Sequence, residues 1–282
     1  MRRAADKLVT LFLWGAVLLL GGLLFCILGF LVNRGWPAIS WSFIFEPPRD
    51  GMTGGGVWTP LVGTFQLIVV SMLATIPIGV GTGLYFSEYA DDSFFTGLLR
   101  QSIRSLAGVP SVVFGLFGLS LFVIFMKFGS SLLSASLTLS CLSLPLMVTA
   151  SEQAFRAVPR DYRDASYALG ATKWQTIRKV VLPTAAPTII TGIILSIGRV
   201  AGETAPIIFT GAAFYTPGVA RSIFDEVMAL PYHVYVLATA GTNIEKTRHL
   251  QYGAILVLVA LVLGISSVGV WMRTRLNRRR RL

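Results

Sequence analysis

The chain has 282 residues, of which 54% are hydrophobic and 13% are charged, and its mean hydropathy is +0.70. This composition excludes an ordinary soluble domain and is typical of an integral membrane protein. The formal net charge of +11 does not require a nucleic-acid partner, because basic residues beside membrane spans set orientation and contact lipid headgroups. The sequence contains no G-x-x-x-x-G-K motif, which excludes nucleotide binding by a phosphate-binding loop. We expect no cofactor, no metal and no catalysis by this chain itself.

Six apolar segments approach the length of about 20 residues that crosses a bilayer as a helix. They cover Leu8–Val32, Leu61–Phe86, Ile103–Met126, Leu132–Ala150, Thr188–Phe214 and Gly253–Met272. Only helices and closed barrels satisfy every backbone polar group in lipid, so these segments predict an all-α integral membrane protein with six transmembrane helices. The first segment lacks a small-residue cleavage site and is interpreted as a retained anchor rather than a signal peptide.

The lysines and arginines are distributed unevenly between the connecting segments. With the N-terminus inside, seventeen of them lie in or beside cytoplasmic segments and six lie outside. This bias predicts that both termini are cytoplasmic. The expected organisation is an N-terminal anchor helix with an external loop (1–58), a membrane-embedded core (59–272) that contains a cytoplasmic loop (151–183), and a basic cytoplasmic tail (273–282).

Small residues and prolines interrupt several spans. Gly79 and Gly83 form a small-xxx-small pair, which predicts close helix packing in the second span. A proline and three glycines in Ala107–Gly118 predict a broken helix in the third span, a feature of transport pathways and also of plain packing. In the external loop Tyr215–Gln251, Ser222–Leu230 has an amphipathic pattern and would lie at the membrane interface or receive an external partner.

The central cytoplasmic loop has the pattern of a helical hairpin with well-defined ends. Asp161 can cap a first helix, Tyr162–Leu169, and Gly170 can adopt the positive φ that ends it. Thr172 has a glutamine three residues later, the capping-box pattern of a second helix start. Pro183 is expected to end that second helix. Capped hairpins of this kind also occur as ordinary cytoplasmic loops, so the pattern alone leaves both interpretations open.

The same loop resembles the cytoplasmic EAA loop of ABC importer permeases. Asp164-Ala165-Ser166 precedes Gly170, and Val180-Val181-Leu182-Pro183 follows after a nine-residue gap. In that family the loop docks into the ATP-hydrolysing subunit and conveys the effect of ATP binding to the membrane. The resemblance therefore implies that Asp164, Ala165, Ser166 and Gly170 couple the chain to a separate ATPase. Small side chains leave one face of the first helix nearly bare, so a partner surface can approach closely.

The fifth apolar segment carries two opposite charges, Arg199 and Glu203, one helical turn apart. A charged residue at membrane depth costs about 2.5–3.5 kcal/mol on insertion scales, so such residues tend to mark pathways. The four-residue spacing allows the two side chains to pair, and the planar guanidinium suits a phosphate-type oxyanion. We identify the pair as a candidate substrate-pathway site. The alternative is a structural ion pair that holds helices together.

The run GRVAGETAPIIFTGA at Gly198–Ala212 is similar to the fifth-span signature of the PstA family, the permease subunits of phosphate-specific ABC importers. Leu106–Gly115 and Tyr85–Tyr89 are similar to other stretches of that family, and the likeness covers essentially the whole chain. It implies the type I ABC importer permease fold and inward phosphate transport across the bacterial inner membrane. The implied partners are a PstC-like permease subunit, two PstB-like ATPase subunits and a periplasmic PstS-like phosphate-binding protein.

Two other functions stay open at this level. The chain would be a permease for another oxyanion, such as sulfate or molybdate, or a membrane regulator that senses phosphate without conducting it. An intramembrane enzyme is disfavoured, because the sequence shows neither a metal-ligand cluster nor a nucleophile–base pair.

Overall fold

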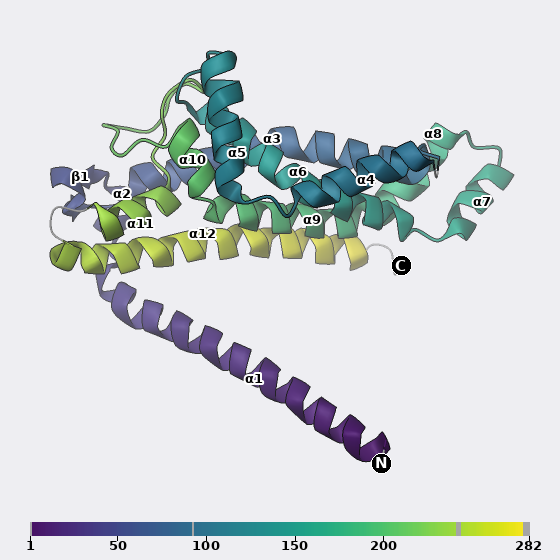
Figure 1. Ribbon diagram of the computed structural model, residues 1–282, viewed down its shortest axis with the longest axis horizontal. Coiled ribbons are helices and arrows are strands. Elements are labelled where there is room, and N and C mark those ends of the chain that lie inside the picture. The colour runs from purple at the N-terminus through teal and green to yellow at the C-terminus, as the bar shows by residue number, and fades with distance from the viewer. Residues whose placement is uncertain (1, 92, 241–243, 279–282) are drawn as a thin grey trace. The chain divides into compact units, whose positions relative to one another are not determined.

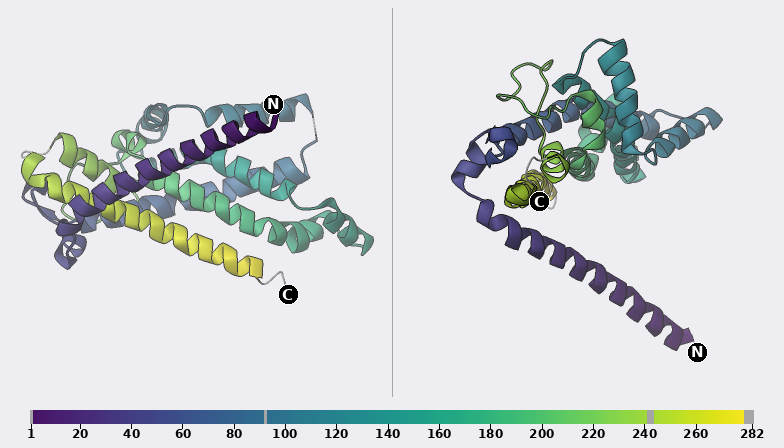
Figure 2. Two further views of the ribbon diagram at one scale, coloured as in Figure 1. Left: turned by 90° about the horizontal axis from the view of Figure 1, so that it is seen from below. Right: turned by 60° about the vertical axis from the view of Figure 1, so that its left-hand side comes forward.

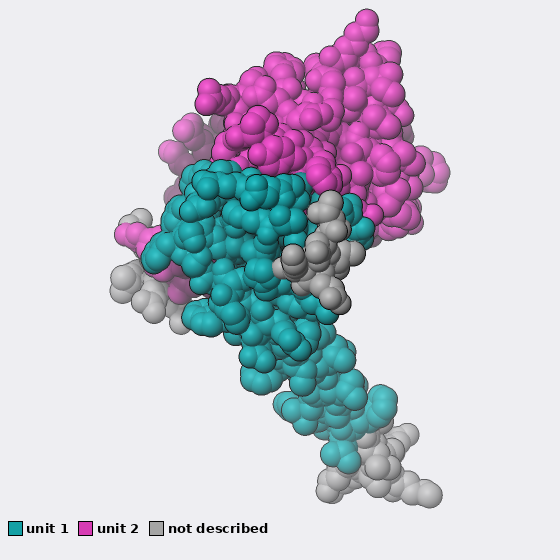
Figure 3. Space-filling view, turned by 90° about the vertical axis from the view of Figure 1, so that its left-hand side faces the viewer, with its two compact units in different colours: residues 1–58, 236–257 teal, residues 59–235, 258–282 magenta. Residues whose placement is uncertain are grey.

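The computed structural model describes residues 2–91, 93–240 and 244–278, which are mostly helical (Figure 1). The chain divides into two compact units (Figure 3). One unit is residues 1–58 with 236–257, and the other is residues 59–235 with 258–282. The first unit therefore joins the N-terminal helix to the start of the last helix, and the second contains the coupling loop and the charged pair predicted from the sequence.

The first unit begins with the long helix α1 (Arg2–Gly35; Figure 2), whose side chains from Thr10 onward are mostly exposed. Short elements follow: η1 (Trp36–Ala38), α2 (Trp41–Phe45), β1 (Pro48–Arg49), η2 (Asp50–Met52) and β2 (Gly54–Gly55). The two strands pair antiparallel. Gly55 has φ +79 and a Cβ there would strike the Pro47 carbonyl oxygen, so this hairpin requires glycine.

The second unit contains most of the helices. They are α3 (Trp58–Glu88, which begins at the unit boundary), α4 (Phe94–Leu106), α5 (Ser111–Gly118), η3 (Leu119–Phe125), α6 (Leu132–Arg156), α7 (Arg160–Ala168), α8 (Lys173–Thr176), η4 (Ile177–Val181), α9 (Leu182–Gly202), α10 (Ala205–Thr210), α11 (Leu230–Thr239) and α12 (Ile244–Arg278), the last two shared with the first unit. Within the described residues, five helices are long and apolar enough to cross a membrane, and one bent pair would make a sixth. This agrees with the six predicted spans.

The third predicted span, Ile103–Met126, is broken, as its proline and glycines predict. The chain bends by 101° between α4 and α5, because Pro110 cannot continue a helix and disfavours helical backbone at the residue before it. Upstream of the bend, α4 is a separate amphipathic helix with exposed apolar residues such as Phe94 and Leu98. Downstream of the bend, α5 continues into η3, which is π-helical.

The second and fourth spans, α3 and α6, pack closely through the predicted glycine pair. A Cβ on Gly79 would lie 2.6 Å from Cγ of Met147, and a Cβ on Gly83 would lie 2.6 Å from Cβ of Ser151. The small-xxx-small prediction is confirmed, since any larger residue would push the helices apart. The apolar core of this unit includes Leu67, Ile68, Met72, Leu132, Leu139, Val200, Ile207 and Val227.

The fifth segment is longer than predicted and breaks near its end. Pro183 does not end the second helix of the hairpin, because α8 continues through the π-helical η4 into α9. Pro183 lies in the first turn of α9, so its missing N–H falls where the backbone changes from π-helical to α-helical hydrogen bonding. The break comes instead at Glu203 and Thr204, after which α10 starts with Pro206 in its first turn.

The segment between the fifth and sixth predicted spans is more ordered than a loop. It includes the helix α11, whereas residues 222–229 of the amphipathic stretch are not helical. The second half of that stretch packs inside: Val227 is buried, and the Leu230 N–H donates a hydrogen bond of 2.8 Å to Oγ1 of Thr64 in α3. This half is therefore part of the core rather than an interfacial surface.

Candidate functional site

The hairpin of α7 and α8 has the predicted ends, with one correction. Gly170 has φ +79, and Thr172 forms a capping box with Gln175, so both predictions are confirmed. Asp161 is not the cap, because Pro159 occupies that position and Asp161 lies in the first turn of α7. A proline at this point has a φ compatible with entry to a helix, and the Asp161 carboxylate interacts favourably with the positive end of the helix dipole.

The four predicted coupling residues differ in solvent exposure. Asp164, Ala165 and Gly170 are exposed. Ser166 is half-buried and its Oγ lies 2.9 Å from Oγ1 of Thr176, so it joins α7 to the end of α8. The exposed large side chains of the hairpin are Tyr162, Tyr167, Leu169 and Trp174, and Leu169 is 89% exposed. An exposed cluster of this kind is typical of a protein contact surface.

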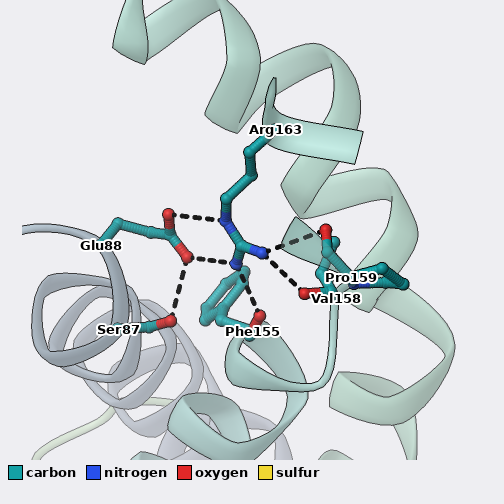
Figure 4. Close-up of polar contacts among 6 residues, drawn as sticks. All are labelled: Ser87, Glu88, Phe155, Val158, Pro159 and Arg163. Atoms are coloured by element: carbon teal, nitrogen blue, oxygen red, sulfur yellow. Dashed lines mark hydrogen bonds and ion pairs between the residues drawn. The ribbon is translucent and has the colours of Figure 1, made fainter. Parts of the chain in front are cut away.

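Arg163 of α7, which the sequence patterns did not single out, fixes the hairpin to two spans (Figure 4). It donates to both carboxylate oxygens of Glu88, the last residue of α3, at 2.7 and 3.2 Å. It also donates to the backbone oxygens of Phe155, Val158 and Pro159 at the end of α6. These bonds use all five N–H groups of the guanidinium. The two charged side chains are only 15% and 7% exposed.

A second charged group lies at the same ends of α3 and α6. The Glu152 carboxylate in α6 pairs with Nε of Arg100 at 2.9 Å and with Nη2 of Arg156 at 3.0 Å. Arg100, which belongs to α4, also donates from Nη2 to the Phe86 carbonyl oxygen of α3 at 2.8 Å. Charged side chains therefore hold the ends of three helices together beside the hairpin.

Arg199 and Glu203 form the predicted pair, but loosely. The nearest nitrogen and oxygen, Nε and Oε1, are 3.7 Å apart, and the side chains are 28% and 19% exposed. This exceeds the 2.7–2.9 Å of a charge-assisted hydrogen bond. Among the residues that the structure describes, the Arg199 guanidinium has no hydrogen-bond acceptor within reach. Arg199 lies in the last turn of α9, at the helix break, rather than in the middle of an unbroken helix.

An apolar cavity of about 560 Å³ lies at the bend between α4 and α5 and is separate from the charged pair. Its lining comes from α3, α4, α5 and α6, includes Thr82 and Cys141, and contains no charged side chain. Burying an anion there would leave its charge uncompensated. The cavity therefore does not compete with Arg199 as an oxyanion site.

The sequence profile of the family described as binding-protein-dependent transport system inner membrane component matches residues 75–282. The chain belongs to this family. It is therefore a multi-pass inner-membrane protein and the permease subunit of an ABC importer, without the catalytic role in ATP hydrolysis. Transport in this family depends on a binding protein.

Relatives match nearly the whole permease. The probable ABC transporter permease protein YqgI of Bacillus subtilis is 33% identical over 290 residues, covering 99% of this chain and 98% of the relative. The phosphate transport system permease protein PstA of Mycobacterium leprae is 36% identical over 284 residues, covering 99% of this chain and 91% of the relative.

Solved structures show the same fold. A bacterial ABC transporter that imports the acidic polysaccharide alginate contains a chain that superposes with a TM-score of 0.65, at 14% identity, over 97% of the permease and 99% of that chain. The MetNI methionine ABC transporter gives a TM-score of 0.58 at 19% identity, over 78% and 94%. These likenesses establish the type I ABC importer permease fold.

Proposed function

We propose that the permease moves inorganic phosphate from the periplasm to the cytoplasm, with both of its termini in the cytoplasm. It assembles with a PstC-like permease subunit, two PstB-like ATPase subunits and a periplasmic PstS-like phosphate-binding protein. The relatives that are named phosphate permeases support this substrate, because their similarity to this chain extends from end to end.

The observation that carries the proposal is the unsatisfied guanidinium of Arg199. Its partner Glu203 lies 3.7 Å away, so the N–H donors of Arg199 are open to a ligand. A dihydrogen or monohydrogen phosphate presents oxygens at a spacing that accepts two parallel N–H bonds from one guanidinium. The location also fits, since an arginine at a helix break in an apolar segment is stable only if it faces water, an anion or a counter-charge.

Glu203 has a complementary role. With no anion present, its carboxylate lowers the cost of holding Arg199 in an apolar segment. When phosphate approaches, Glu203 repels it and keeps the interaction with Arg199 weak enough for release. The pair thus forms a charged step in the pathway, and the second permease subunit completes the remaining wall.

The α7–α8 hairpin is the coupling element. Asp164, Ala165 and Gly170 are exposed, and Leu169 beside them presents an apolar tip. These residues dock on an ATPase subunit, whereas Ser166 stabilises the hairpin internally through Thr176. ATP binding draws the two ATPase subunits together, and the hairpins convey that movement to the spans in a cycle of alternating access.

Uptake of radiolabelled anions in cells that lack the native chain tests the proposal. The unaltered chain should restore phosphate uptake and leave sulfate and molybdate uptake unchanged. Arg199→Gln should reduce phosphate uptake by about 10- to 150-fold, which corresponds to the roughly 1.5–3 kcal/mol of a hydrogen bond to a charged group. Arg199→Lys keeps the charge but not the planar fork and should retain little uptake. Glu203→Gln should have a smaller effect.

The matched control is Arg104→Gln, which removes an exposed arginine from α4 and should leave uptake at the unaltered level. The double variant Arg199→Glu/Glu203→Arg separates transport from a structural role, because a structural pair needs only mutual attraction. Full uptake in Arg199→Gln, or rescue by the exchanged pair, would remove Arg199 from the phosphate path. Restoration of sulfate or molybdate uptake instead of phosphate would reassign the substrate.

A further inference from the structure

The attachment of the coupling hairpin to the spans is concentrated on one short segment, Phe86–Tyr89 at the end of α3. Glu88 receives Arg163 of α7, and the ring of Tyr89 lies 4.5 Å from Nζ of Lys173, the first residue of α8. Both helices of the hairpin therefore contact consecutive residues where α3 ends, Glu88 and Tyr89. Glu88 is further oriented by the Ser87 hydroxyl, which donates to Oε1 at 2.9 Å.

Arg163 also occupies the end of α6. The last carbonyl groups of a helix have no partners within the helix. Arg163 donates to one of them, the Phe155 oxygen, and to the Val158 and Pro159 oxygens of the linker that follows α6. Its positive charge lies at the C-terminal ends of both α3 and α6, where the helix dipoles are negative. One side chain thus joins three helices, and Figure 4 shows it at their meeting point.

We propose that Arg163 and Glu88 form a rigid joint that transmits displacement of the hairpin to the cytoplasmic ends of α3 and α6. They are positioning residues, because neither touches the transported anion. The inference rests on the proposed coupling role of the hairpin. Without the joint, the linker Ala157–Pro159 would absorb movement of α7, and the end of α3 would no longer follow it.

The geometry distinguishes this joint from an ordinary surface ion pair. An exposed ion pair contributes little to stability, because water solvates both charges and the paired side chains lose conformational entropy. Glu88 and Arg163 are 7% and 15% exposed, and every guanidinium donor has an acceptor in this one arrangement. Any displacement of α7 relative to α3 therefore breaks several hydrogen bonds at once, which makes the connection stiff.

The experiment measures the number of anions imported per ATP hydrolysed, with the complete importer in lipid vesicles. Arg163→Gln should lower this ratio by at least about tenfold in assembled complexes, while basal ATP hydrolysis stays within about twofold of the unaltered level. Arg163→Lys should give an intermediate ratio, because lysine reaches Glu88 but cannot also satisfy the end of α6. Arg160→Gln, which removes an exposed arginine from the first turn of the same helix, is the matched control and should not change the ratio.

If Arg163 had only a structural role, Arg163→Gln would lower the amount of assembled importer, but the importers that assemble would import the usual number of anions per ATP. That result would overturn the proposal. If Arg163→Gln does not assemble, Glu88→Gln decides, because it preserves side-chain shape and removes only the charge. A ratio reduced about two- to fivefold supports the joint, and an unchanged ratio refutes it. Ala165→Glu tests separately whether the hairpin docks on an ATPase subunit. Normal transport in that variant would refute docking. Loss of transport in Ala165→Glu, together with an unchanged number of anions per ATP in Arg163→Gln, would refute the joint alone.

Discussion

Replacing Gly83 with alanine should separate α3 from α6, whereas the same change at Gly81 should not. The two glycines lie two residues apart in one helix. A Cβ on Gly83 would lie 2.6 Å from Cβ of Ser151 and 2.7 Å from the backbone nitrogen of Glu152. A Cβ on Gly81 would meet nothing within 4 Å. Gly81→Ala is therefore a control that differs only in what the new methyl group contacts.

The expected loss of stability is the difference between the Gly83→Ala and Gly81→Ala variants. Ordinary carbon contacts are about 3.5–4.0 Å, so at Gly83 the helices must separate by roughly 1 Å. Overpacking of this kind costs about 1–3 kcal/mol. The gain of about 0.5–1 kcal/mol from replacing glycine inside a helix is common to both variants and cancels. Gly83→Ala should therefore be less stable than Gly81→Ala by about 1–3 kcal/mol.

The assay is thermal denaturation of the assembled importer in detergent micelles, with phosphate uptake measured in parallel. Gly83→Ala should denature at a lower temperature than Gly81→Ala and transport less, since a shift of Glu152 also weakens its pairs with Arg100 and Arg156. Equal midpoints for the two alanine variants would refute close packing of α3 on α6 at this position.

Two further predictions concern the outer segment and the orientation. Burial lowers the pKa of His233 in α11 to about 4, whereas in the unfolded chain its pKa is about 6.5. As the pH drops from 6.5 towards 4, the unfolded chain therefore binds the proton first and the folded protein loses stability, by about 2 kcal/mol at pH 5. Limited proteolysis of this segment should accelerate at pH 5 in the unaltered protein but not in His233→Gln. The control His249→Gln changes an exposed histidine and should accelerate like the unaltered protein. The same acceleration in His233→Gln would show that protonation of His233 is not the cause. With Cys26 and Cys141 replaced by serine, Arg160→Cys should react with an impermeant maleimide only from the cytoplasmic side and Glu226→Cys only from outside; the reverse pattern would overturn the proposed topology.

Short-range features of this fold were predictable from the sequence because they depend on a few neighbouring residues. The capping box at Thr172 and the positive φ of Gly170 are set by local backbone geometry. Likewise, the spacing of Gly79 and Gly83 was enough to predict close packing, although not the identity of α6 as the partner. Orientation and the roles of Arg199 and Asp164 stay predictions.

The errors arose where one local rule was applied without the context that changes it. Pro183 ends a regular α-helix, but here it follows a π-helical turn and the helix continues. The break in Ile103–Met126 was predictable from Pro110 and the nearby glycines, but its angle of 101° was not, because length and composition do not set an angle. Asp161 suits a cap, but Pro159 two residues earlier already starts the helix.

The joint of Arg163 and Glu88 could not be derived from spacing, because 75 residues separate its members. A usable signal was present: Glu88 and Glu152 are acidic residues near the ends of two apolar segments, on the side where arginines predominate. A buried carboxylate requires a cationic or hydrogen-bonding partner. An acid in that position therefore indicates a basic residue on a neighbouring helix, but only the fold identifies which one.

Two arginines of this permease differ in how many of their hydrogen-bond donors are used within the protein, and this difference fits a structural role for one and a transport role for the other. Arg163 uses all five donors on protein acceptors, so it has none left for a ligand and serves to hold helices together. Arg199 has a counter-charge at 3.7 Å and donors that its neighbours leave open, so an oxyanion can complete its coordination. The helical run Lys173–Gly202 of 30 residues, about 45 Å long at 1.5 Å per residue, connects the hairpin at one end to Arg199 at the other. In the proposed mechanism, a displacement of the hairpin that Arg163 passes to α3 and α6 also moves the helix that carries Arg199, which would give ATP binding a direct mechanical route to the charged step.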